Sequence, residues 1–331
     1  MIAVDSVQDV TQEDRLRGAI WGQFVGDAAA LGTHWIYDLE KMAKLYPEGV
    51  NGFEAPLPGH YHYGKKPGDQ THYGDGALVL LESIAKEGQF DPKAFGRSFV
   101  ERFQPKSYSG YLDKATRGTL ENYAKFLEKN RELEFDFQQG ADDEELAAGS
   151  RLASLVARYW NDRSLLERVE QATRVCQNNA TAIAYMKFNA LLLAELFRGR
   201  DVHTALHGVE DQILEVAPEL GQEIRRKSRQ ALEETLNEVV EATQLFGQSC
   251  PLPHSFPSSI HALLKHTDDF ETAVLATLRA GGGSAARAAM LGAWLGARRG
   301  LGGIPKAWRS RLTNGERISV ATEKIVSDQR P

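Results

Sequence analysis

Residues 17–38 read RGAIWGQFVGDAAALGTHWIYD, and this stretch predicts the core of the fold. Gly18, Gly22 and Gly26 recur at every fourth position, so on a helix they form one stripe without side chains. A glycine inside a helix costs about 1 kcal/mol relative to alanine, so three in register need a compensating contact. We therefore expect another backbone or a ligand to approach this helix closely, next to Asp27 at the end of the stripe.

A second stripe of small residues lies near the end of the chain, at Ser284, Ala288, Gly292, Gly296 and Gly300. Small residues let two helix axes approach closer than the usual distance of about 8–10 Å. We predict that the two striped helices pack against each other or flank the same cavity. In that arrangement Asp27 meets the turn at 281–287. The alternative is that each stripe packs against an unrelated bulky neighbour.

The composition is that of a globular protein, since 42% of the 331 residues are hydrophobic. The formal net charge of -6 and the lack of a basic block argue against nucleic-acid and membrane partners, whereas a small anionic substrate is compatible. The two cysteines, Cys176 and Cys250, are too few for a disulfide or zinc framework. The start of the chain has no leader pattern, so we predict a cytoplasmic protein. The sequence does not indicate an oligomeric state.

Helical periodicity dominates from Thr11 onward, without an internal repeat or a clear linker. We predict one all-α domain over 1–331, with about a dozen or more helices and a flexible segment at 1–11. Asp142 with Glu145, and Asp268 with Glu271, are spaced as capping boxes, which favours a helix start over a cation site in the acidic run at 142–145. Helices are predicted over 39–46, 112–129, 142–160, 180–198, 201–216, 220–245, 271–279 and 284–299, and from Asp75 and from Asp91 onward. The proline-rich segment 247–257 is predicted to be a loop.

The longest stretch without helical periodicity is 47–72, PEGVNGFEAPLPGHYHYGKKPGDQTH. A structureless stretch of this length is usually functional or disordered, and its aromatic residues argue against disorder. Histidines are concentrated in and beside it, at positions 34, 60, 62 and 72. We expect this segment to contribute to a site.

Three stretches resemble the ADP-ribosylglycohydrolase family, which includes the jellyfish J-type lens crystallins. They are GAIWGQFVGDAAALGTHWIYD near the start, PGDQTHYGDGALVLLESIA from Pro67, and AGGGSAARAAMLGAWLGARRGLGGIPKAW near the end. The resemblance implies an orthogonal bundle of many helices around a central cleft. It also implies an enzyme with two magnesium ions that cleaves ADP-ribose from a protein side chain or a small acceptor.

The metal motifs of the family are only partly present. Its Thr-Asp-Asp-Thr motif corresponds to Tyr-Gly-Asp-Gly at 73–76, and its Gly-Gly-Asp-x-Asp-Thr motif to GGGSAA at 281–286. An early glutamate of the family aligns with His34, and a histidine from the middle of the family with Gln-Asn-Asn at 177–179. Magnesium takes about six oxygen ligands, several of them carboxylates. We therefore expect no cofactor, because most ligands for magnesium are missing.

The remaining polar and aromatic residues of these stretches are the candidates for a site. The predicted catalytic residues are Asp27, Asp75, His34 and His72. The predicted substrate-binding residues are Thr33, Trp35, Tyr37, His60, His62, Tyr73, Gly281, Gly282, Gly283, Ser284 and Arg287. Simpler interpretations stay open: Asp75 as a helix N-cap, and the histidines at 60 and 62 as packing or surface residues.

Two functions follow from these candidates. In the first, Asp27 or Asp75 acts as general base or stabilises an oxocarbenium ion, and a histidine acts as acid or orienting group. The substrate would be an N- or O-glycoside of ribose, with a base stacked on Trp35, Tyr37, Tyr61 or Tyr73 and a phosphate paired with Arg287. In a variant of this enzyme, histidines and Asp75 hold a single ion of zinc or another transition metal. In the second, the chain is a non-catalytic binder of a nucleotide or ADP-ribose, or a structural protein like the lens crystallins.

Overall fold

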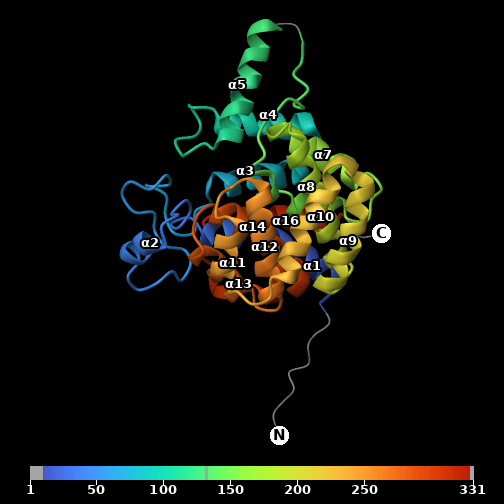
Figure 1. The fold of residues 1–331 in the computed structure, drawn as a ribbon. Helices are drawn as coiled ribbons and strands as arrows, with labels where there is room; N and C mark the ends of the chain where they lie inside the picture. The colour runs from blue at the N-terminus through green and yellow to red at the C-terminus, as the bar shows by residue number, and fades with distance from the viewer. Residues whose placement is uncertain (1–9, 131–132, 329–331) are drawn as a thin grey trace.

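A computed structural model describes residues 10–130 and 133–328, and Figure 1 shows its helices. The predicted all-α class is confirmed: the described residues form sixteen α-helices and two short 3-10 helices, with isolated bridges in place of strands. The flexible segment predicted at 1–11 falls largely on residues 1–9, which lie outside this description. The α-helices are α1 (Gln12–Ala29), α2 (Leu39–Leu45), α3 (His72–Glu87), α4 (Pro92–Phe103), α5 (Lys114–Lys129), α6 (Ala153–Tyr159), α7 (Leu165–Cys176), α8 (Ala180–Phe197), α9 (Val202–Val216), α10 (Pro218–Glu233), α11 (Val239–Phe246), α12 (Leu252–Lys265), α13 (Phe270–Arg279), α14 (Ser284–Arg299), α15 (Lys306–Arg309) and α16 (Gly315–Ser327).

The two striped helices, α1 and α14, pack against each other along their glycines, as predicted. A Cβ placed on Gly22 would lie 2.0 Å from the carbonyl oxygen of Gly292, and one on Gly26 would lie 2.1 Å from that of Ala288. Real Cβ contacts are never so short, so only glycine lets the two backbones approach to this distance. The contact explains why the helix tolerates three glycines.

The helix α8 lies in the core beside this pair. It is the one helix in the described part of the chain that is long and apolar enough to cross a membrane, yet 72% of its apolar window is buried inside the protein. It packs between α7, α9 and α14. Trp294 of α14 is fully buried and donates its ring N–H to Asn189 Oδ1 of α8 at 2.7 Å.

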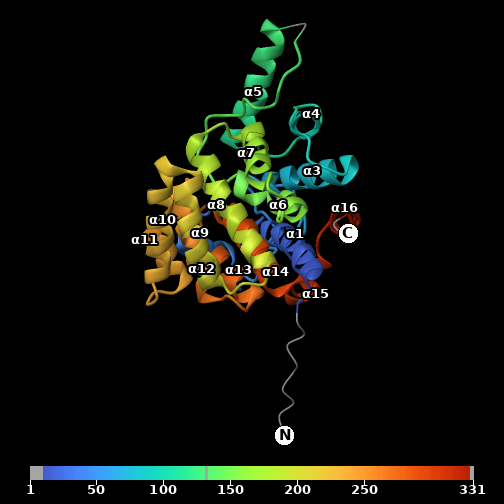
Figure 2. The ribbon, with the colours of Figure 1, turned by 90° about the vertical axis from the view of Figure 1, so that its right-hand side faces the viewer.

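Two parts of the chain extend from the helical body. Figures 1 and 2 both show α5 projecting from the top of the bundle, and Figure 1 shows α2 and the connected loops at its left edge. The irregular segment predicted at 47–72 is confirmed up to the start of α3, since no helix interrupts residues 47–71. Its end is fixed by Thr71, which caps α3 by accepting from the amide of Tyr73. The interpretation of Asp75 as a helix cap is therefore wrong.

Several predicted helices are interrupted. The helix expected over 142–160 is replaced by a loop, a 3-10 turn at Ala148–Ser150 and the short α6. No helix begins directly after Asp142, so the predicted capping box there is wrong. The helix expected over 220–245 divides into α10 and α11. Helix α13 is capped by Asp269, which accepts from Thr272 N, and not by the predicted Asp268.

The proline-rich segment 247–257 was expected to be a loop, and this prediction is wrong from Leu252 onward. Helix α12 begins there with Pro253 in its first turn, where a backbone N–H has no partner within the helix in any case. Pro257 lies inside the same helix. Helices α15 and α16, which the sequence analysis did not identify, form the end of the chain.

Candidate functional site

The end of α1 and the start of α14 meet at the turn around Trp35, as the glycine pattern predicts. The amide of Trp35 donates to Gly282 O at 2.7 Å, and Gly282 N donates to Ile36 O at 2.9 Å. The amide of Ala285, in the first turn of α14, donates to His34 Nδ1 at 3.1 Å. Trp35 has a φ of 63°, which is rare for a bulky residue and marks a position held by its surroundings.

Asp27 links the last turn of α1 to the cap of α3. It is fully buried, and its carboxylate accepts from Thr71 N at 2.8 Å and from Thr71 Oγ1 at 2.5 Å. The amide nitrogen of Gln70, oriented toward it, lies 2.8 Å from Oδ2. Burial raises the pKa of Asp27 to about 7, although the hydrogen bonds from Thr71 oppose this shift. The carboxylate is thus enclosed by donors from one loop and does not line either pocket described below.

Asp75 forms ion pairs with two cationic side chains. Its carboxylate pairs with Lys65 Nζ at 2.8 Å and Arg102 at 3.0 Å, and it accepts from the hydroxyl of Tyr108 at 2.9 Å. It lines a surface pocket between α3, α4 and α16, which is separate from the turn around Trp35. The two predicted catalytic carboxylates therefore do not share one cavity.

The predicted histidines do come together. His34, His62 and His72 are buried, with ring centroids 5.3 to 6.3 Å apart. His34 Nε2 and both ring nitrogens of His62 and His72 have no hydrogen-bond partner. Burial, as the largest cause, lowers the pKa of all three, to about 2 for His62. These imidazoles are neutral. Nearby His60 donates through Nε2 to His34 O at 2.8 Å.

The residues present do not fit two magnesium ions. A side chain at Gly74, where the family carries its first aspartate, would place a Cβ 2.3 Å from Asp27 Oδ2. A side chain at Gly283, aligned with another family aspartate, would place a Cβ 2.8 Å from Cys250 Sγ. Nor does any group of three His, Cys, Asp or Glu residues within 10–130 and 133–328 have an arrangement that could hold a metal ion. This last observation also argues against the zinc variant.

The predicted binding residues of the 281–287 turn are mostly internal. Arg287 is fully buried, and its guanidinium donates to the carbonyls of Gln248, at 2.9 Å, and Gly281. Burial lowers its pKa to about 10. The hydroxyls of Ser284 and Tyr73 are buried without a partner, and Thr33 Oγ1 donates to Ala30 O at 3.3 Å. These groups support the turn from behind the pockets.

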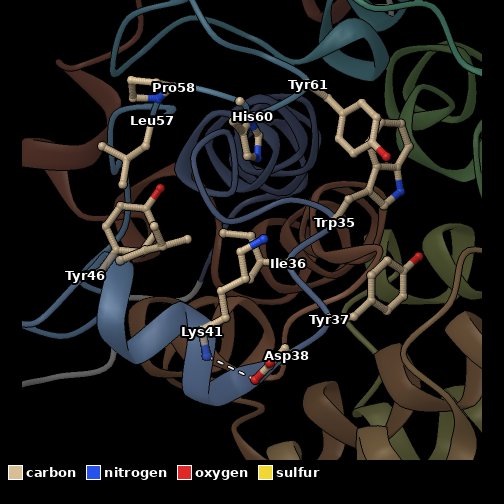
Figure 3. Close-up of a pocket in the computed structure, with 12 residues that line it drawn as sticks. Trp35, Ile36, Tyr37, Asp38, Lys41, Tyr46, Leu57, Pro58, His60 and Tyr61 are labelled. Atoms are coloured by element: carbon tan, nitrogen blue, oxygen red, sulfur yellow. Dashed lines mark hydrogen bonds between the residues drawn. The ribbon is translucent and has the colours of Figure 1, made fainter.

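Two pockets open on either side of an aromatic wall formed by Trp35, Tyr37 and Tyr61. We name the first the tyrosine pocket. It has a volume of about 440 Å³ and lies between α2 and the loop at 57–61, with Tyr46 opposite the wall (Figure 3). The rings of Trp35 and Tyr61 contact each other edge to face, with centroids 5.0 Å apart. Tyr61 is 58% exposed, an unusual exposure for a large aromatic side chain.

We name the second the acidic pocket. Its volume is about 340 Å³, and its lining includes the aromatic wall together with Tyr111, Asp113, Lys114, Arg117, Glu145 and Cys250. Tyr111 contacts Trp35 at 4.9 Å and Tyr61 at 5.1 Å between ring centroids, so three aromatic rings meet at one edge. The pocket thus combines aromatic surface, two carboxylates and two cations.

The two carboxylates of the acidic pocket have different surroundings. Asp113 is buried and caps α5, where its Oδ1 accepts from Thr116 N at 2.8 Å while Oδ2 has no hydrogen-bond partner. Glu145 is half-buried. Burial, followed by the charges of Asp143 and Asp113, raises its pKa to about 7, and Lys114 opposes this shift.

Gln177 holds the Glu145 segment in position. Its side-chain N–H groups donate to Glu145 O at 2.7 Å and to Asp143 Oδ1 at 2.9 Å, and its Oε1 accepts from Ala148 N at 2.7 Å. On the other side, Glu145 forms an antiparallel bridge with Pro251. The family histidine aligns with the segment that contains Gln177. In this chain, Gln177 instead fixes the backbone of Glu145.

The sequence analysis missed Asp113, Glu145 and Tyr111 as candidates. The acidic run at 142–145 was interpreted as a helix cap, because its spacing fits one. The small-residue run AAGS at 147–150, directly after it, has no helical periodicity. This was the signal in the sequence that could have indicated a loop at 142–145 instead of a helix start. Asp113 lay inside the helix predicted over 112–129, whereas the structure makes it the N-cap of α5.

Comparison with known proteins agrees with this architecture. A model of the ADP-ribosylglycohydrolase family matches residues 8–331. Crystallins J1A and J1B of Tripedalia cystophora are 26% and 27% identical, each aligned over 95% of this chain and covered to 96% and 97% of their own length. A solved structure described as an ADP-ribosylglycohydrolase-related protein complex shares the fold, with a TM-score of 0.72, 23% identity and coverage of 96% of this chain and 99% of that one. The chain belongs to the ADP-ribosylglycohydrolase family.

Proposed function

We propose that this chain hydrolyses an N- or O-glycosidic bond of a ribosyl ligand of the nucleotide type, in the acidic pocket and without a pair of magnesium ions. The observation that carries the proposal is the content of that pocket, in which aromatic rings, cations and carboxylates line one cavity. Ligand pockets combine apolar or aromatic walls with a few polar groups that fix orientation.

Each part of the pocket suits a part of such a ligand. The edge formed by Trp35, Tyr61 and Tyr111 offers ring surface for a base. Lys114 and Arg117, in the first turn of α5, supply positive charge at a helix N-terminus, which favours a phosphate. Arg117 also lies over the Tyr111 ring, 5.7 Å from its centroid. The ligand would therefore place its base on the aromatic edge and its phosphate near the start of α5.

The proposal leaves out the metal centre because its carboxylate ligands are replaced or already paired. The two family aspartates are replaced by Gly74 and Gly283, which have no ligand atom in a side chain, and Asp75 is already paired with two cations. A water molecule activated by metal, which the family relies on, therefore has no ligand set here. The proton transfers must come from side chains of the pocket.

Calorimetric titration with ADP-ribose tests the binding part of the proposal. We expect Arg117→Gln to weaken ADP-ribose binding by about tenfold or more, because a charge-assisted hydrogen bond to phosphate contributes about 1.5–3 kcal/mol. Lys125→Gln is the matched control, since it removes one positive charge from the same helix outside the pocket. Equal affinity of Arg117→Gln and wild type would remove the acidic pocket from the proposal.

A non-catalytic binder is the second candidate. The replacement of the family aspartates by Gly74 and Gly283 favours it, because carboxylates that a magnesium-dependent hydrolase needs as ligands are missing at both positions. Binding of ADP-ribose without release of any ribosyl product supports this candidate over the hydrolase. Absence of both binding and turnover leaves a structural role of the crystallin type.

A further inference from the structure

We propose that Glu145 and Asp113 form the catalytic pair of the acidic pocket, with Glu145 as general acid toward the leaving group and Asp113 as base toward water. This inference rests on the proposed function and deepens it, because it replaces the missing metal by two named carboxylates. Glycoside hydrolysis commonly uses such a pair, one protonated and one ionised.

The first argument is that the two carboxylates line the same cavity as the aromatic rings. Both line the acidic pocket beside Trp35 and Tyr111. The carboxylate of Glu145 has no hydrogen-bond or ion-pair partner among residues 10–130 and 133–328, although its backbone is fixed by Gln177 and Pro251. A rigid backbone with a free carboxyl group is the arrangement expected of a group that exchanges a proton with a ligand.

The second argument is the free oxygen of Asp113. Its side chain is 2% exposed, its Oδ1 is held by the α5 amide of Thr116, and its Oδ2 has no hydrogen-bond partner. Buried polar atoms are nearly always satisfied, so this oxygen implies a water molecule or a ligand group on the pocket side. Behind it lies His72, whose Nε2 is 3.8 Å from Oδ2 and is also without a partner.

The surroundings separate the roles of the two groups. Burial and the neighbouring Asp143 and Asp113 raise the pKa of Glu145 to about 7, so part of the population carries a proton near neutral pH. Asp113 accepts from an amide at the N-terminus of a 16-residue helix, where the dipole stabilises an anion. We therefore assign the acid role to Glu145, and the base role to Asp113, whose Oδ2 is free to accept a proton from water.

The step balances without a metal or a further reactant. The bond between ribose C1 and the leaving atom breaks, and Glu145 gives its proton to that atom. Water adds its oxygen to C1, and Asp113 takes the water proton. The products are the free ribosyl ligand and the protonated leaving group, and the two carboxyl groups return to their starting states by exchange with solvent.

The test compares two glycosides of ADP-ribose that carry 4-nitrophenol or methanol at the terminal ribose, each supplied as both anomers. A good leaving group such as 4-nitrophenolate needs little help from an acid, whereas methanol needs a proton. We expect Glu145→Gln to lose about 100-fold or more on the methyl glycoside and only a few-fold on the nitrophenyl glycoside, and to lose the alkaline decline of kcat/KM near pH 7. Asp113→Asn keeps the helix cap and should lose about 100-fold or more on both substrates.

Glu144→Gln is the matched control, because it removes an exposed neighbouring carboxylate. Melting temperatures of all variants verify folding. If wild type cleaves the glycosides and both Glu145→Gln and Asp113→Asn stay within about threefold of it on both substrates, this pair is wrong while the hydrolase proposal stands. If wild type binds ADP-ribose and cleaves neither glycoside, the hydrolase proposal fails and the pair fails with it.

Discussion

At the scale of single residues, Asp27 shows that the role of a carboxylate depends on the groups around it. Asp27 lies at the end of the glycine stripe, and the sequence suggests a catalytic role for it. A carboxylate buried beside a tightly packed helix costs free energy unless it has partners, and a substrate could be such a partner. The structure supplies a structural reason, since Asp27 receives donors from Thr71 and Gln70 and thereby joins α1 to the cap of α3. Sequence alone does not separate the two roles, because both require the same residue type.

The raised pKa of Asp27 makes a prediction about stability. Its value of about 7 in the folded chain lies above the ordinary 3.8, so the folded chain binds more protons than the unfolded chain between these pH values. The contribution of Asp27 to the free energy of unfolding therefore falls as pH rises from about 4 to about 7. Asp27→Asn, which is neutral throughout, should lose this dependence.

Urea unfolding of wild type and Asp27→Asn across this pH range measures the effect. The free energy of unfolding of the variant, relative to wild type, is expected to rise steadily toward neutral pH. A constant difference between the two proteins across the whole range would show that the raised pKa has no consequence for folding.

At the scale of the elements, the contact between α1 and α14 was predictable and the local helix boundaries were less so. Glycine at every fourth position constrains a backbone contact directly, so the sequence indicates the partner as well as the packing. The segment 142–160 was not predictable in the same way. Its acidic start fits a helix cap, but bonds from Gln177, which is distant in sequence, hold it as a loop.

The contact between the two glycine stripes can be tested by adding one methyl group. Gly22→Ala would place a Cβ 2.0 Å from Gly292 O, so the helices must separate or bend. We expect the free energy of unfolding to fall by about 3 kcal/mol or more. Gly208→Ala in α9 is the control, since nothing lies within 4 Å of its Cβ. That variant should gain up to about 1 kcal/mol, and a Gly22→Ala protein as stable as wild type would contradict the packing described.

At the scale of the whole molecule, the acidic pocket assembles groups from five separate parts of the chain. Trp35, Tyr61, Asp113, Glu145 and Cys250 reach it from the turn after α1, the irregular loop, the cap of α5, the loop before the 3-10 turn and the start of α12. Sequence reasoning identified the two aromatic residues, because the stretches around them are unusual in composition. It did not identify the carboxylates, because their proximity depends on the complete fold.

The central claim is that ribosyl hydrolysis in this protein depends on side chains of the acidic pocket and not on a pair of magnesium ions. The most direct test is the initial rate of cleavage of the 4-nitrophenyl glycoside of ADP-ribose by the wild-type protein in excess EDTA and in excess magnesium. The account predicts equal rates under the two conditions. Cleavage that appears only when magnesium is added would contradict it.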